Sequence, residues 1–114
     1  MEKIARQVFL YDFYGELLTE HQKSAYEDVV LNDMSLSEIA EERGISRQGV
    51  HDLIKRCDKI LSGYEEKLHL VERFLKTTED VKRICELSAR YGQSEVTEVM
   101  EEIHRISHQI LEEL

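Results

Sequence analysis

The sequence predicts an all-α protein, a helix-turn-helix bundle followed by a long helix and C-terminal helices. Three observations support this fold class. The 114 residues include no proline, which interrupts helices, and they are rich in Glu, Leu, Lys and Ile. Apolar side chains recur at helical spacing along most of the chain. With 41% apolar and 34% charged residues, the chain has the composition of a folded protein.

The first two helices are expected in residues 2–18 and from Thr19 onward. The apolar stripe of the first helix comprises Ile4, Val8, Tyr11 and Leu18, widened by Leu10, Phe13, Tyr14 and Leu17. Thr19 can accept a hydrogen bond from the amide of Gln22, and the Gln22 side chain can reach back. This capping box predicts the start of the second helix, which we expect to end at Asn32 and Asp33.

Residues 35–56, SLSEIAEERGISRQGVHDLIKR, have the pattern of a helix-turn-helix. Ser35 or Ser37 caps a short helix, Gly44 suits the left-handed turn, and Ser46 caps the second helix. In this motif the second helix, called the recognition helix, is presented to a nucleic acid. The pattern therefore predicts a nucleic-acid-binding surface on the helix that begins near residue 47.

The expected contact residues lie on the early exposed turns of that helix. They are Arg47, Gln48, His51, Lys55 and Arg56. Gln48 could pair with adenine, and Arg47 could contact guanine or a phosphate. Asp52 lies on the same face and would repel phosphates. Binding by a single chain should therefore be weak, so we expect a dimer or a partner to assist it.

The charge distribution explains how an acidic chain can carry such a surface. The formal net charge is −9, yet residues 35–61 contain five basic and five acidic side chains. The excess acid lies in residues 1–34 and 77–114, which have net charges of −4 and −5. The acidity is concentrated at both ends, away from the helix-turn-helix.

Two apolar seams predict association. The first alternates steps of three and four through Ile54, Cys57, Leu61, Tyr64, Leu68, Val71 and Leu75, as one helix growing out of the recognition helix. The second contains Val96, Val99, Ile103, Ile106, Ile110 and Leu114. These seams could pack on a second chain or on the chain's own helices. The expected homodimer interface comprises Leu61, Tyr64, Leu68, Val71, Leu75, Val99, Ile103, Ile106 and Ile110.

We expect two domains, a helix-turn-helix domain over residues 1–61 and a helical extension over residues 62–114. In the extension, a new helix is predicted to begin at Thr77 or Thr78 and to end at Gly92. Ser94 is expected to cap the last helix.

Motifs of enzymes and cofactor sites are absent from the sequence, which contains no HExxH, GxSxG or phosphate-binding loop. His104 and His108 have metal-ligand spacing near Glu101, but such a spacing often occurs by chance, and Glu98, Glu101 and Glu102 are interpreted as a solvated face. Cys57 and Cys85 are interpreted as small buried residues in a reduced cytosolic protein. We therefore expect no enzyme activity, cofactor, membrane span or signal peptide.

The segment LSLSEIAEERGISRQGVHDLIKR is similar to the helix-turn-helix of sigma factor region 4, and LLTEHQKSAYEDVVLNDM resembles that region's preceding helix. More specifically, the chain resembles the YlxM family of small bacterial proteins. The similarity covers YDFYGELLTEHQKSAYEDVVLNDMSLSEIAEERGISRQGVHDLIKRCDKIL and, in length and character, the acidic helical tail. The resemblance implies a cytosolic, all-helical protein of the signal recognition particle pathway. Asp52 departs from the basic or small residue usual in sigma factors.

Three functions fit this sequence. The first is an accessory protein of the signal recognition particle pathway that contacts the particle's RNA or its GTPase. The second is a transcription regulator that binds duplex DNA as a homodimer through residues 46–56. The third is a helix-turn-helix used only for contact with another protein.

Overall fold

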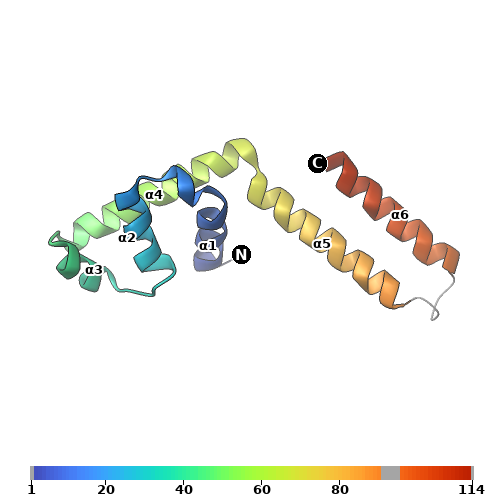
Figure 1. The fold of residues 1–114 in the computed structure, drawn as a ribbon, viewed down its shortest axis with the longest axis horizontal. Coiled ribbons are helices and arrows are strands. Elements are labelled where there is room, and N and C mark those ends of the chain that lie inside the picture. Colours follow the sequence, from blue (N-terminus) through green and yellow to red (C-terminus); the bar gives the residue numbers. More distant parts are fainter. Residues whose placement is uncertain (1, 91–95, 114) are drawn as a thin grey trace. The chain divides into compact units, whose positions relative to one another are not determined.

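The computed structural model describes residues 2–90 and 96–113, and these are almost entirely helical (Figure 1). The elements are α1 (Lys3–Tyr14), η1 (Gly15–Leu17), α2 (Glu20–Val30), α3 (Leu36–Arg43), α4 (Arg47–Leu68), α5 (Leu70–Ala89) and α6 (Val96–Glu113). No strand occurs among these residues, which confirms the predicted all-α fold. The chain divides into two compact units, residues 1–71 and 72–114, with the boundary inside α5. The division into a helix-turn-helix domain over residues 1–61 and a helical extension over residues 62–114 stays a prediction.

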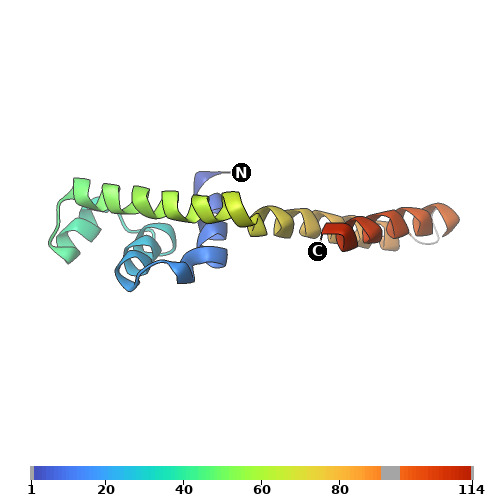
Figure 2. The ribbon, with the colours of Figure 1, turned by 90° about the horizontal axis from the view of Figure 1, so that it is seen from above.

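The first unit is built around α4. Helices α1, α2 and α3 each pack against it; in the ribbon, α2 and α3 lie along one side of α4 and α1 crosses it (Figure 2). The core between them contains Leu10, Tyr14, Ala25, Tyr26, Ile39, Val50, Cys57 and Leu61. Because α4 supplies Val50, Cys57 and Leu61 to this core, its opposite face is left for solvent.

Helices α2, α3 and α4 begin at the capping residues that the sequence predicted. Thr19 and Ser35 each form a complete capping box, with Gln22 and Glu38 respectively, so Ser35 and not Ser37 caps α3. Gly44 ends α3 with a φ of +68°, in the left-handed region that favours glycine. The caps at Ser35 and Ser46 and the turn at Gly44 confirm the helix-turn-helix.

The first expected helix is shorter than the stripe that predicted it. Regular α-helix ends at Tyr14, and residues 15–17 form a 3₁₀ turn before Leu18 adopts an extended backbone. A Cβ atom at Gly15 would lie 2.8 Å from the ring of Tyr11, so the turn depends on the absence of a side chain there. The 3₁₀ turn brings Leu18, which is 6% exposed, into the core.

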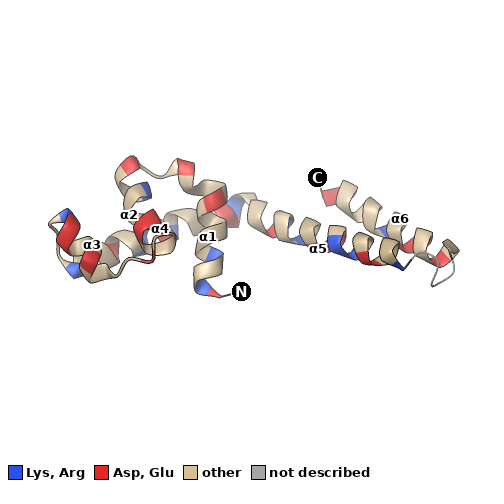
Figure 3. Ribbon diagram, turned by 60° about the horizontal axis from the view of Figure 1, so that its bottom comes forward, with Lys and Arg blue, Asp and Glu red and all other residues tan. Residues whose placement is uncertain are grey.

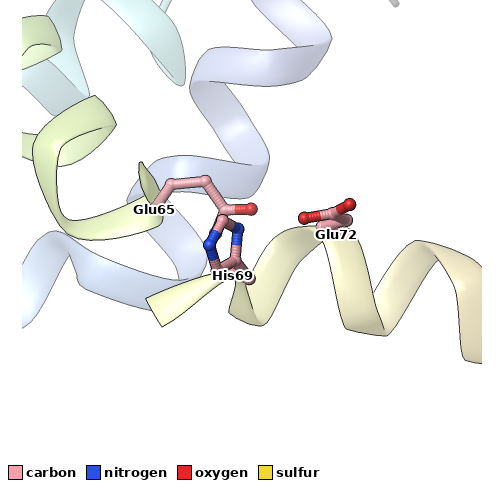
Figure 4. Close-up of side chains that lie close together, drawn as sticks. All are labelled: Glu65, His69 and Glu72. Carbon is pink, nitrogen blue, oxygen red and sulfur yellow. The ribbon is translucent and has the colours of Figure 1, made fainter. Parts of the chain in front are cut away.

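The prediction of one continuous helix carrying the apolar seam from Ile54 to Leu75 was wrong, because α4 ends at Leu68. His69 follows with a φ of +56°, and Glu65 and His69 mark this end of the helix (Figure 4). The amide of Val71 donates to Glu65 Oε1 over 2.9 Å, and the amide of Leu70 donates to Tyr14 Oη over 3.1 Å. These side chains satisfy donors that a continuous helix would direct to its own carbonyls.

The helix start expected at Thr77 or Thr78 was also wrong, because both residues lie inside α5. The Thr78 hydroxyl donates to the Phe74 carbonyl over 2.8 Å, a bond typical of a helix interior and not of a cap. Gly92 and Ser94, expected to end one helix and begin the next, lie outside the described residues.

The second unit is formed by the rest of α5 and by α6. Its buried residues Leu87, Val99 and Ile106 pack together, and Ile84, Ile103 and Ile110 flank them half-buried. Val81, Val96, Met100 and Leu111 remain exposed. This unit therefore buries few apolar side chains of its own.

Candidate nucleic-acid interface

The candidate interface begins at the first residue of α4. The Ser46 hydroxyl accepts a hydrogen bond from the amide of Gly49 over 2.9 Å, which fixes the start of the helix at Arg47. A Cβ atom at Gly49 would lie 3.1 Å from Ser46 Oγ, so a side chain there would crowd the cap.

All five expected contact residues, Arg47, Gln48, His51, Lys55 and Arg56, are exposed. They alternate along α4 with the buried Val50, Ile54 and Cys57. At 100° per residue, this pattern puts the five polar side chains on the half of α4 that faces away from the core. The structure thus brings them onto one exposed surface, although their binding to nucleic acid stays a prediction.

Asp52 is the acidic member of this surface. Its Oδ1 atom accepts a hydrogen bond from Gln48 Nε2 over 3.0 Å and lies 3.6 Å from His51 Nδ1. The bond to Asp52 uses one of the two N–H groups of the Gln48 amide. Among the expected contact residues, Arg47, Lys55 and Arg56 are the cations that could attract phosphates.

Acidic residues near the helix-turn-helix limit the area of positively charged surface. Arg43, at the end of α3, donates to Asp28 over 3.0 Å and to Ser24 over 2.7 Å. Glu41 and Glu42 on α3 are exposed. Acidic and basic residues are interspersed over the helices of this unit (Figure 3). The cationic surface is therefore narrow and follows the start of α4.

A hollow of about 430 Å³ lies at this surface, lined by Leu36, Arg47, Gln48 and His51. A second hollow of about 360 Å³ shares Leu36 and His51 with the first and extends to the start of α1. It brings Lys3 and Ile4 to the recognition surface. No pattern in the sequence predicts these two residues at this surface, because only the packing of α1 on α4 places them there.

The residues expected at a dimer interface differ in burial and lie in both units. Leu61 and Val71 are 0% and 2% exposed inside the first unit, and Tyr64 stacks on Tyr14 with ring centroids 6.0 Å apart. Val99 and Ile106 are buried in the second unit, and Ile103 and Ile110 flank them. Leu75 is half-buried, and Leu68 is 46% exposed. Leu61 and Val71 thus have no surface left for a second chain.

The two thiols differ. Cys57 is buried, and burial, followed by the charge of Asp58, raises its pKa to about 11. Cys85 is exposed, which corrects the expectation that both cysteines are buried. The apolar neighbours of Cys85 in the sequence misled that expectation, because this position faces solvent on α5.

None of the helices in the described part of the chain has both the length and the apolar character needed to cross a bilayer.

Comparisons with known proteins agree with this architecture. The family model UPF0122, described as "Putative helix-turn-helix protein, YlxM / p13 like", matches residues 1–110. A UPF0122 protein of Bacillus pumilus is 45% identical over 100 residues, which cover 88% of this chain and 91% of the relative. The UPF0122 protein YlxM of Bacillus subtilis is 42% identical over 107 residues, covering 93% and 97%. A relative in Desulforamulus reducens is 38% identical over 112 residues, covering 98% and 96%.

Proposed function

Because the chain belongs to the UPF0122 family of YlxM / p13-like helix-turn-helix proteins, we propose that it binds nucleic acid through α4 as an accessory protein of the signal recognition particle pathway. The observation that carries the first part is the exposed surface of Arg47, Gln48, His51, Lys55 and Arg56 on a capped recognition helix. The pathway rests on the family resemblance. In this proposal the protein acts in the cytosol.

The charges indicate which binding strength to expect. The three cations among the expected contact residues, Arg47, Lys55 and Arg56, provide few phosphate contacts, and exposed acids lie on α3. The logarithm of affinity should then fall with the logarithm of salt concentration with a slope of about −2 to −3, for about three contacts. Binding of this kind suits a protein that acts together with a second macromolecule.

A salt series tests the proposal. Fluorescence anisotropy would measure the affinity for signal recognition particle RNA, for mixed duplex DNA and for the particle's GTPase. We expect binding to the RNA with the shallow slope above. Tight, sequence-selective binding to duplex DNA, with a steep slope and no binding to the particle's RNA or GTPase, would contradict the pathway.

The second candidate is a transcription regulator that binds duplex DNA as a homodimer. A dimer is favoured by the exposed apolar side chains of the second unit, which surround a small core: Val81, Val96, Met100 and Leu111. The same pair of helices, α5 and α6, from a second copy of the chain would cover these side chains. Sedimentation at micromolar concentration tests the dimer, and a monomer at that concentration would exclude it.

A further inference from the structure

The 360 Å³ hollow beside the recognition surface has apolar walls. Ile4 of α1, Val29 of α2, Leu36 of α3 and Ile54 of α4 line it. Ile54 is 8% exposed and Ile4 is 53% exposed, so the hollow runs from the core to the surface. Helix α1 crosses α4, and α2 and α3 pack against α4 as well (Figure 2). A ligand in the hollow would contact apolar groups contributed by four helices.

The polar residues of the hollow lie at its two extremes. Gln7 is 6% exposed, and its Nε2 atom donates to both carboxylate oxygens of Asp58, over 3.0 and 3.2 Å. Lys3, His51 and Lys55 line the same hollow and are exposed. The hollow therefore combines the buried Gln7 amide and the half-buried Asp58 carboxylate with lysines near solvent. A ligand that matches it needs an apolar body, hydrogen-bonding edges and a negative charge near its entrance.

The hollow continues the candidate nucleic-acid interface. Leu36 and His51 line both this hollow and the one beside Arg47 and Gln48. Arg47, His51 and Lys55 follow one another at intervals of four, so they form one row along α4. A nucleic-acid strand whose phosphates follow this row would pass the entrance of the 360 Å³ hollow.

We propose that the 360 Å³ hollow receives an unpaired nucleobase of the strand bound along α4. A nucleotide has a base with apolar faces and hydrogen-bonding edges, and a phosphate attached through its sugar, which are the three properties that the hollow requires. Bases of a duplex are stacked, and removing one costs a few kcal/mol. RNA loops present unpaired bases without that cost. The inference rests on the proposed nucleic-acid binding and specifies its substrate as an RNA loop or single strand.

The test compares an RNA hairpin that carries a loop of mixed sequence with a fully paired RNA duplex of the same stem. Ile4→Phe would fill the hollow, and the position tolerates a larger side chain because Ile4 is 53% exposed. Leu17→Phe is the matched control, since Leu17 is 55% exposed and lies outside the hollow. Lys3→Glu is a second variant, which places a negative charge near the entrance.

Wild-type protein should bind the hairpin about ten-fold more tightly than the duplex, in keeping with one stacked base. Ile4→Phe and Lys3→Glu should remove this preference, whereas Leu17→Phe should retain it. A hairpin preference that survives Ile4→Phe overturns the nucleobase site and leaves the proposed function standing. If Ile4→Phe instead weakens only binding to the particle's GTPase, the hollow receives a protein side chain and the nucleobase site is overturned. Failure of wild-type protein to bind either RNA contradicts the proposed function itself.

Discussion

The Asp58 carboxylate joins three helices inside the first unit. Its Oδ1 atom accepts hydrogen bonds from Tyr26 Oη over 2.5 Å and from Gln7 Nε2 over 3.0 Å. Burial and the bond to Asp58 raise the pKa of Tyr26 far above its usual value, so the tyrosine stays a donor at neutral pH. These bonds link α1, α2 and α4 next to the proposed nucleobase site.

Replacing Tyr26 with phenylalanine should lower the free energy of unfolding by about 1–3 kcal/mol, because the half-buried Asp58 carboxylate loses a donor from a tyrosine that is 0% exposed. Urea denaturation followed by circular dichroism measures the loss. Tyr11→Phe is the matched control. Tyr11 donates to Glu27 at a half-buried position, and its replacement should cost less. An equal loss of unfolding free energy in the two variants would contradict the expectation that the cost rises with burial of the tyrosine.

Cys57 and Cys85 should react at very different rates with a thiol reagent. At pH 8 the buried Cys57, with a pKa raised to about 11, has little thiolate and no access to solvent. Cys85 is exposed and should react quickly. A colorimetric titration should count one fast thiol in native protein and two in urea, and Cys85→Ser should remove the fast phase. Two fast thiols in the native protein would contradict the burial of Cys57.

At the scale of elements, local signals were sufficient to predict caps but not the break between α4 and α5. The boxes at Thr19 and Ser35 and the turn at Gly44 depend on residues within four positions of each other. The break at His69 depends on Glu65 and on Tyr14, whose hydroxyl donates to Glu65 Oε1 over 2.6 Å across 51 positions. A heptad pattern depends only on neighbouring residues and is insensitive to such a long-range contact, so it predicted a longer helix.

Glu65→Ala should destabilise the protein by about 1–3 kcal/mol, because the Tyr14 hydroxyl and the Val71 amide both lose a buried acceptor. Glu65→Gln keeps an accepting oxygen and should cost less. Glu66→Ala, at the exposed neighbouring position, should change stability by no more than about 0.5 kcal/mol. Thermal unfolding of the three variants checks the order. A Glu65→Ala variant as stable as Glu66→Ala would remove the proposed cause of the helix break.

At the scale of the whole molecule, the acidic net charge of −9 coexists with a narrow cationic row on α4. The exposed face of α4 could be predicted because helical periodicity separates Arg47 and Lys55 from Val50 and Ile54. The hollow that adds Lys3 and Ile4 could not be predicted from the sequence, because it forms only where separate helices meet. Sequence periodicity therefore predicts the row of contacts, and tertiary packing adds the site beside it.

The most direct test of nucleic-acid binding through α4 is the affinity of an Arg47→Ala, Lys55→Ala, Arg56→Ala triple variant for the hairpin RNA. The matched control is the Lys82→Ala, Arg83→Ala, Arg90→Ala variant, which removes three exposed cations from the second unit and has the same net charge. At about 1 kcal/mol or more for each contact, the α4 variant should lose about 100-fold in affinity, together with its salt dependence. The control should bind like wild type. Equal affinity of the two variants would contradict the assignment of α4 as the contact surface.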